Sequence, residues 1–284
     1  MVGPRLPAAT IYGTSCLMSA IVPPTVLVTG AARRIGRGLA LDLAASGWRV
    51  AVHFERSVTD ADGVVDEIRA AGGAAETVCA DLLDPEATSA LARRAAIALG
   101  SPLTCVINNA SLFEHDCVET LTADSFDRHL AINLRAPVLL AQAFSAQLPA
   151  GVSGNVVNII DQRVWRPTPD FVSYTLAKSG LWTATRTLAQ ALVPRIRVNA
   201  IGPGPVLQSI HQTAAEFAEE ARSTPLGRAT SIDEIAAAVR FILASPSMTG
   251  QMIALDGGQH LEWRQEHPGR PEAAPPAEGR TSTS

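Results

Sequence analysis

The sequence predicts an α/β protein with a doubly wound parallel sheet of about seven strands in a single domain. Short apolar runs alternate with longer helical stretches between residues 25 and 263. Several of these runs are continuously apolar and bounded by turn residues, which is typical of strands buried on both faces. Strand–helix alternation indicates right-handed βαβ units and therefore parallel strands. No internal repeat or change in composition divides this stretch.

The first strand is expected at TVLVT (25–29), and a glycine-rich turn leads from it into a helix at 35–46. Asp84 and Pro85 favour a helix start, and Ser231 with Glu234 forms a capping-box pattern for the last helix. The other expected strands are 49–54, 75–80, 103–108, 154–160, 195–201 and 251–255, and the other expected helices are 60–71, 85–98, 123–148, 172–192 and 231–244.

The two ends of the chain differ from the predicted domain. Residues 1–24 are interpreted as a flexible lead, because the folded pattern begins only at residue 25. Residues 11–22 are moderately apolar but make a poor signal peptide, since one charge precedes them and two prolines follow. Residues 264–284 are rich in proline, charge and small polar side chains, which predicts a disordered tail.

Composition excludes several classes of function. A net charge of −4 over 284 residues gives no basic surface for nucleic acid. No stretch is long and apolar enough to span a bilayer. The four cysteines form no CxxC pair and no histidine cluster has metal-ligand spacing, so we expect reduced thiols, no metal and a cytoplasmic protein.

The glycine-rich turn after the first strand reads TGAARRIGRG (29–38). Gly30 permits a tight turn, and Gly36 lets the start of the helix approach a ligand closely. Free backbone N–H groups and the helix dipole favour a pyrophosphate at this position. The context therefore predicts a Rossmann-like dinucleotide site, whose residues are Gly30, Arg33, Arg34, Ile35 and Gly36.

The end of the second strand distinguishes NADPH from NADH. An NAD site typically has an acidic residue there, which binds the ribose 2′-hydroxyl. Arginine instead favours a 2′-phosphate, because its planar fork donates two hydrogen bonds. Only Glu55 in HFERS (53–57) argues for NADH. We predict NADP(H) as the cofactor, and the candidate 2′-phosphate ligands are Arg33, His53, Arg56 and Ser57.

Tyr174 and Lys178 are four residues apart in the helix expected at 172–192, on one helix face. A free tyrosine has a pKa of about 10, and a neighbouring ammonium lowers this pKa by stabilising the phenolate. Tyr174 is therefore predicted to donate a proton to a substrate oxygen or nitrogen near neutral pH. The same spacing also occurs by chance as a surface pair, so the other motifs have to decide.

These motifs follow one another in a recognisable order. The glycine-rich turn is followed by Asp81, the NNA motif (108–110), Asn133, the Tyr174/Lys178 pair and the PG motif (203–204). Together, over about residues 25–262, they resemble the short-chain dehydrogenases/reductases. The resemblance implies an NADP(H)-dependent oxidoreductase and a homotetramer.

The resemblance also implies roles for individual residues. Asn133 would hold a water that relays protons with Lys178, and Lys178 would bind the nicotinamide ribose. Tyr174 would be the proton donor. The residues that would flank the adenine, line the cofactor or abut the nicotinamide are Asp81, Leu82, Asn109, Ala110, Pro203 and Gly204.

Two positions depart from the usual pattern of that family. Arg34 replaces the middle glycine of the phosphate loop, and Asp161 stands where a serine usually follows the fifth strand. Both departures, together with HFERS (53–57) and NNASLF (108–113), resemble the pteridine reductases. A carboxyl group at this position suits a substrate with ring N–H donors, or proton delivery to a ring nitrogen. Dihydropterins provide both.

A pterin site is therefore implied. Phe113 would stack on a flat heteroaromatic ring and sandwich it against the nicotinamide. Segments 164–171 and 205–222 would close over the substrate, with Trp165 and Leu207 as candidate lining residues. The implied substrate-binding residues are Arg34, Ser111, Phe113, Asp161 and Tyr174.

Three functions remain open, all with a small-molecule ligand. The first is hydride transfer from NADPH to a C=N or C=C bond of a dihydropterin or related pterin. The second is a carbonyl reductase such as a 3-oxoacyl-acyl-carrier-protein reductase, which Tyr174 and Lys178 support equally but Asp161 disfavours. The third is a non-catalytic NADPH-binding sensor, which the intact Asn133, Tyr174 and Lys178 disfavour.

Overall fold

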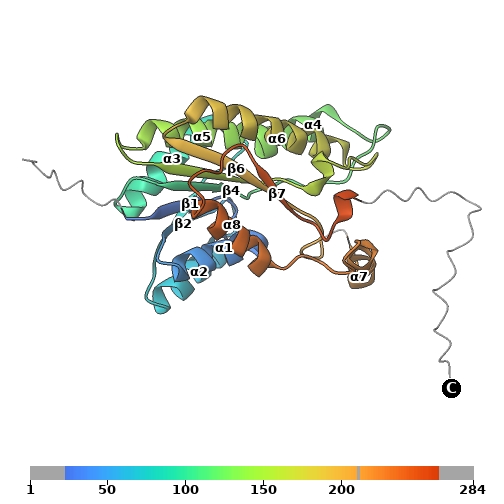
Figure 1. Ribbon diagram of the computed structural model, residues 1–284, viewed down its shortest axis with the longest axis horizontal. Coiled ribbons are helices and arrows are strands. Elements are labelled where there is room, and N and C mark those ends of the chain that lie inside the picture. Colours follow the sequence, from blue (N-terminus) through green and yellow to red (C-terminus); the bar gives the residue numbers. More distant parts are fainter. Residues whose placement is uncertain (1–22, 210–211, 262–284) are drawn as a thin grey trace, which may run out of the picture.

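The computed structural model describes residues 23–209 and 212–261 of the chain. Within them, seven parallel strands form one sheet in the order β3-β2-β1-β4-β5-β6-β7, as predicted (Figure 1). The predicted lead and tail lie outside these residues, apart from Pro23 and Pro24. The strands are β1 (Thr25–Val28), β2 (Arg49–Phe54), β3 (Ala74–Cys79), β4 (Cys105–Asn108), β5 (Gly154–Ile159), β6 (Ile196–Pro203) and β7 (Met252–Leu255).

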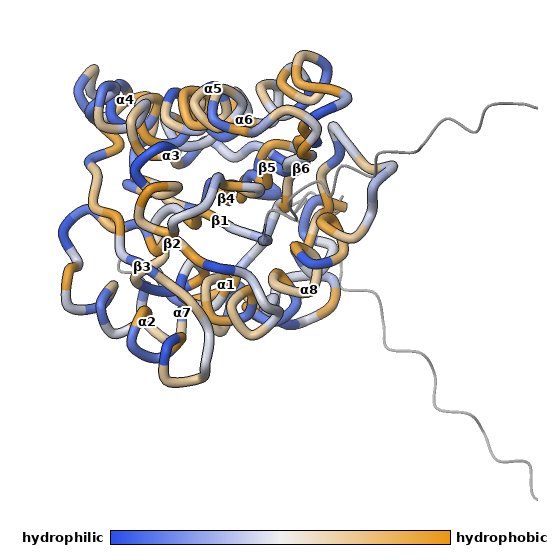
Figure 2. The backbone as a smooth tube through the Cα atoms, turned by 90° about the vertical axis from the view of Figure 1, so that its left-hand side faces the viewer, coloured by the Kyte–Doolittle hydropathy of each residue, from blue (hydrophilic) through white to orange (hydrophobic). Residues whose placement is uncertain are grey.

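Helices cover both faces of the sheet in a Rossmann-like arrangement (Figures 1 and 2). One layer contains α1 (Arg34–Ala45), α2 (Val58–Ala70) and α8 (Ile232–Leu243). The opposite layer contains α3 (Pro85–Leu99), α4 (Ala123–Leu130), α5 (Ala136–Gln147) and α6 (Val172–Leu192). A further helix, α7 (Ala214–Ser223), lies away from the sheet (Figure 1). None of the helices in the described residues has the length and apolar character needed to cross a membrane.

The central strands are apolar on both faces because each face packs against a helical layer. In β1, Val26 and Val28 belong to the core beneath α1, α2 and α8, whereas Leu27 belongs to the opposite core. All three side chains are fully buried. Continuous apolar runs are therefore the expected pattern for these strands.

The order of strands reverses between β1 and β4, which are adjacent in the sheet but far apart in the chain. In open α/β sheets, the connections on the two sides of such a point diverge and leave a crevice at the carboxyl ends of the strands. The turns after β1 and β4 border this crevice, and it is where the predicted cofactor site falls.

The helix expected at 123–148 is interrupted. A π-helical turn, η1 (Ala131–Arg135), separates α4 from α5. Pro137 has no N–H to donate to the carbonyl of Asn133, so the regular ladder of α-helical bonds cannot continue there. Helix α7 was expected only as part of a covering segment. Its start, Thr213, forms a capping box with Glu216 that the TAAE pattern already contained.

Replacing Phe144 with alanine tests the core beneath α3, α5 and α6. Phe144 is fully buried, and we expect Phe144→Ala to lower the free energy of unfolding by about 3–5 kcal/mol. Phe241→Ala is the matched control, because Phe241 on α8 is 58% exposed. Its effect should stay within about 0.5 kcal/mol in urea denaturation. Equal losses in the two variants would contradict this division into core and surface.

Candidate active site

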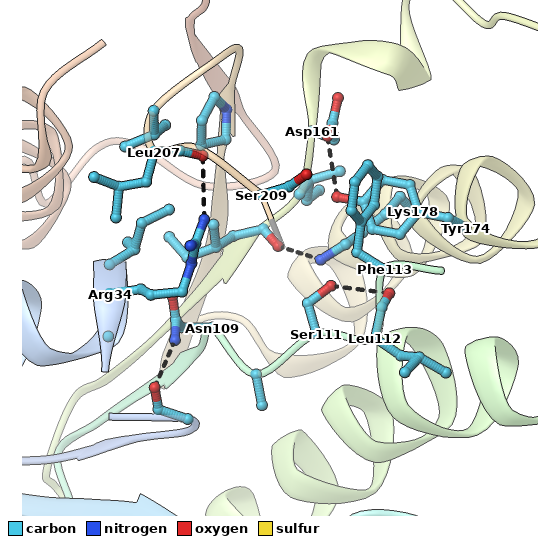
Figure 3. Close-up of a pocket in the computed structure, with 18 of the residues that line it drawn as sticks. Arg34, Asn109, Ser111, Leu112, Phe113, Asp161, Tyr174, Lys178, Leu207 and Ser209 are labelled. Atoms are coloured by element: carbon cyan, nitrogen blue, oxygen red, sulfur yellow. Dashed lines mark hydrogen bonds between the residues drawn. The ribbon is translucent and has the colours of Figure 1, made fainter. Parts of the chain in front are cut away.

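A cavity of about 1110 Å³ opens at the carboxyl ends of β1, β4, β5 and β6 (Figure 3). Pockets for one drug-sized ligand usually measure about 300–1,000 Å³, so this cavity has room for a dinucleotide together with a small substrate. All predicted site residues border it except Asn133, Arg56 and Ser57.

The turn between β1 and α1 fits a pyrophosphate. Gly30 has a φ of +62°, a left-handed conformation that favours glycine. A Cβ on Gly36 would lie 2.2 Å from the carbonyl oxygen of Gly30 and 2.5 Å from Nδ2 of Asn109. Only glycine fits at position 36, and the start of α1 can therefore approach a bound cofactor closely.

His53 braces this turn. Its Nδ1 accepts a hydrogen bond from the Gly30 N–H at 3.0 Å, and its Nε2 lies 3.2 Å from the carbonyl oxygen of Ala80. Burial lowers the pKa of His53 to about 4, so the ring is neutral at physiological pH. Both ring nitrogens are occupied. In this arrangement the neutral ring has no free donor and supports the turn, and its contact with a 2′-phosphate stays a prediction.

The other predicted phosphate ligands lie at the surface. Arg33 borders the cavity and forms an ion pair with Asp60 at 2.5 Å. Arg56 pairs with Glu55 at 2.8 Å, and its side chain is 84% exposed. Arg56 and Ser57 lie outside the cavity lining, so Arg33 is the predicted 2′-phosphate ligand that the structure places best.

Arg34 links the phosphate loop to the segment after β6. Its guanidinium donates to the carbonyl oxygen of Leu207 at 3.2 Å (Figure 3). It also donates to the carbonyl oxygen of Gln208 at 2.8 Å. Its backbone has a φ of 54°, in the left-handed region that a non-glycine residue rarely adopts. Arg34 therefore connects the turn after β1 with the segment after β6, and both border the cavity.

Tyr174, Asp161 and Lys178 meet beneath the cavity. The Tyr174 hydroxyl donates to Oδ2 of Asp161 at 3.0 Å, and the Arg163 N–H donates to Oδ1 at 2.8 Å. Nζ of Lys178 donates to the carbonyl oxygen of Ile159 at 2.8 Å. One turn of α6 thus places the predicted proton donor and ammonium on the same face, as their spacing predicted.

Burial has the largest effect on the pKa values of Asp161, Tyr174 and Lys178. It raises the pKa of Asp161 above its usual value and lowers the pKa of Lys178 to about 8. Burial and the Asp161 charge together raise the pKa of Tyr174 well above 10. The predicted lowering of the Tyr174 pKa is therefore wrong for the protein without its ligands, because Lys178 does not outweigh burial. Tyr174 is fully protonated at neutral pH.

Asn133 forms three hydrogen bonds through its side chain. Its Oδ1 accepts from Oγ of Ser111 at 3.1 Å and from the Leu112 N–H at 2.9 Å, and its Nδ2 donates to the Leu112 carbonyl at 2.8 Å. The side chain of Asn133 thus fixes the loop after β4. It also positions Ser111, and its contact with a relay water stays a prediction.

An aromatic wall closes one side of the cavity. Phe113 stacks on Phe171 with ring centroids 4.3 Å apart and an interplanar angle of 6°. Phe113 also meets the Tyr174 ring edge-on at 4.8 Å. Phe171 ends segment 164–171, which was predicted to cover the substrate, but it was not singled out, because only the folded loop brings it beside Phe113. Trp165, a predicted lining residue, instead packs against Trp182 and His260.

Two further parts of the lining were not predicted individually. The guanidinium of Arg163 lies 4.8 Å from the centroid of the Phe171 ring and 4.0 Å from Asp161. Helix α7 contributes Glu216, Phe217 and Glu220. The capping pattern would have revealed α7, whereas nothing local in the sequence distinguishes Arg163.

The chain is similar to a known family and to solved structures. A family model described as enoyl-(acyl carrier protein) reductase matches residues 30–260. The FolM alternative dihydrofolate reductase 1 of Brucella suis, solved with NADP, is 48% identical with a TM-score of 0.83, over 86% of this chain and 97% of that one. The Brucella canis protein of the same name, also with NADP, is 47% identical with a TM-score of 0.84, over 87% and 97%.

A curated relative carries a different name. The 3-oxoacyl-[acyl-carrier-protein] reductase of Synechocystis sp. is 31% identical over 85% of this chain and 98% of its own length. The names of these relatives therefore agree on a reductase and differ on its substrate.

Replacing Gly36 with alanine tests the cofactor cradle. The added Cβ would collide with the Gly30 carbonyl, so we expect NADPH binding to weaken at least about 100-fold in a fluorescence titration. Gly63→Ala is the control, because a Cβ there meets nothing within 4 Å. That variant should keep wild-type affinity and gain about 0.5–1 kcal/mol of stability from its helical position. Wild-type affinity in Gly36→Ala would exclude this cradle.

Proposed function

Because this chain belongs to the short-chain dehydrogenase/reductase family and is an NADP-dependent reductase, we propose that it reduces a dihydropterin or a related pterin. The observation that carries the proposal is the hydrogen bond between the Tyr174 hydroxyl and the Asp161 carboxylate. A carbonyl group has only acceptor atoms, so a carboxylate beside it is repelled. A dihydropterin has ring N–H groups that a carboxylate can accept from.

The aromatic wall supports the same substrate class. Phe113 and Phe171 form a flat apolar surface next to Tyr174, which suits a planar heteroaromatic ring. The identity of 48% to a protein named alternative dihydrofolate reductase points to the same chemistry, whereas the 3-oxoacyl reductase relative is only 31% identical.

The chain would contribute binding, orientation and proton transfer. The cradle of Gly30 and Gly36 would hold the pyrophosphate, and Lys178 would bind the nicotinamide ribose. Bound NADPH supplies the hydride. Tyr174 holds the proton to be delivered, and its raised pKa keeps that proton in place until the substrate nitrogen accepts it. Asp161 orients both the hydroxyl and the substrate N–H groups.

We further propose that the enzyme works as a homotetramer in the cytoplasm, as the family resemblance implies. The free thiols of Cys79, Cys105 and Cys117 fit a reducing compartment. Size-exclusion chromatography with light scattering would measure the assembly directly, and a monomeric mass would contradict this proposal.

The substrate proposal is tested by NADPH oxidation against dihydrobiopterin, dihydromonapterin, dihydrofolate and an acetoacetyl thioester. We expect turnover of at least one pterin and little of the thioester, with NADH a much poorer donor. Tyr174→Phe should reduce turnover about 10²–10⁴-fold and keep NADPH affinity, because it removes only the proton donor. Turnover of the thioester alone would reject a pterin substrate.

The pH dependence tests the electrostatics of the site. The kcat/KM for the pterin should fall as pH rises through about 8, where Lys178 loses its proton. The Asp161 charge raises the pKa of Lys178, so Asp161→Asn should move this midpoint to lower pH in the residual activity. Asp170→Asn, a change at an exposed carboxylate, should leave it in place. A midpoint that moves upward in Asp161→Asn would disprove this coupling.

A further inference from the structure

Gln162 is the residue directly after Asp161 and begins the short 3₁₀ turn η2 (Gln162–Val164). Its backbone is fixed, because its carbonyl accepts from the Trp165 N–H at 2.9 Å and the Arg166 N–H at 3.3 Å. Gln162 is one of the residues that line the cavity, and it is only 4% exposed. A buried polar residue with a fixed backbone thus lines the cavity directly beside Asp161.

The carboxamide of Gln162 has no partner among the described residues. Its Oε1 is buried without a donor, and its Nε2 makes no hydrogen bond there either. Burying an unpaired amide destabilises a protein, and folded structures contain few such groups. The neighbouring polar side chains differ in this respect, since Asp161, Tyr174, Lys178 and Asn133 each form at least one hydrogen bond within the protein.

Gln259 resembles Gln162 but lies elsewhere in the cavity. Its Oε1 also has no donor, yet a Cβ on Gly204 would lie 3.1 Å from that oxygen. Gly204 is the predicted neighbour of the nicotinamide, which places Gln259 on the cofactor side. Gln162 instead adjoins Asp161, on the side where the substrate ring would be protonated.

We propose that Gln162 is a specificity-determining residue whose carboxamide binds the polar edge of the substrate heterocycle. The inference rests on the proposed function. A carboxamide offers an N–H donor and a C=O acceptor in one plane, and rotation of the terminal group exchanges their positions. The lactam edge of a pterin offers the complementary pair, a ring N–H beside a carbonyl oxygen. A ketone or thioester has only acceptors and leaves Oε1 of Gln162 unpaired.

Binding of the substrate heterocycle by Gln162 would explain why the protein contains a buried amide without a partner. A site that contains an unpaired polar group rejects ligands that cannot complete its hydrogen bonds. The 3₁₀ turn keeps the carboxamide next to the Asp161 carboxylate, so two adjacent residues would bind the same ring edge. Asp161 accepts only, whereas Gln162 both donates and accepts.

The test is Gln162→Met, which keeps the length of the side chain and removes both polar atoms. We expect the KM for the dihydropterin to rise about tenfold, with NADPH affinity unchanged. We also expect the melting temperature of the ligand-free variant to equal or exceed that of the wild type, because an unpaired buried amide has been removed. Gln190→Met, at an exposed position on α6, is the control and should change neither quantity.

The outcomes separate this inference from the proposed function. If the wild type reduces pterins and Gln162→Met keeps the wild-type KM, the role of Gln162 is wrong and the substrate class stands. A lower melting temperature with an unchanged KM would assign Gln162 a purely structural role. If the wild type reduces only the thioester, both the substrate class and the contact are overturned.

Discussion

The site depends on the junction between the carboxyl ends of β1 and β4. The Thr29 hydroxyl oxygen accepts from the N–H groups of Asn109 at 2.9 Å and Ala110 at 3.0 Å. Nδ2 of Asn109 donates to the carbonyl oxygens of Thr29 at 2.8 Å and Gly30 at 3.2 Å. Two turns that are about eighty residues apart in the chain are joined here. The space for a cofactor exists because these turns are fixed against each other at the point where the strand order reverses.

The same junction leads to Tyr174, the predicted proton donor. Beyond Ala110 the chain reaches Ser111 and Leu112, which Asn133 holds by three hydrogen bonds. Phe113 then packs edge-on against Tyr174. Because Tyr174 and Asp161 are buried together, neither group ionises as it would in water, and the proton stays on the phenol. The position of the aromatic wall and the protonation of the donor thus follow from one arrangement of loops.

Predictions from the sequence were accurate for features that depend on a short stretch of chain or on a periodic pattern of residues. Buried parallel strands, the glycine cradle and the spacing of Tyr174 and Lys178 each follow from a short stretch of chain, and the structure has them in place. They failed where the outcome depended on tertiary burial. That the ring of His53 bonds through both nitrogens to the turn after β1 and to Ala80 could not be foreseen from its place in the sequence. The pKa of Tyr174 rises, although its ammonium neighbour alone predicted a fall. Phe171 and Arg163 lie in a loop whose path no pattern predicts.

Arg34 shows how the departure from glycine in the phosphate loop contributes to the site. A left-handed φ costs a non-glycine residue about 1–2 kcal/mol, and glycine would adopt it without strain. The arginine offsets that cost with two charge-assisted hydrogen bonds to the carbonyls of Leu207 and Gln208. These carbonyls belong to the segment that borders the substrate part of the cavity. The residue that shapes the turn after β1 therefore also holds the segment after β6, so two distant parts of the cavity lining are joined through a single side chain.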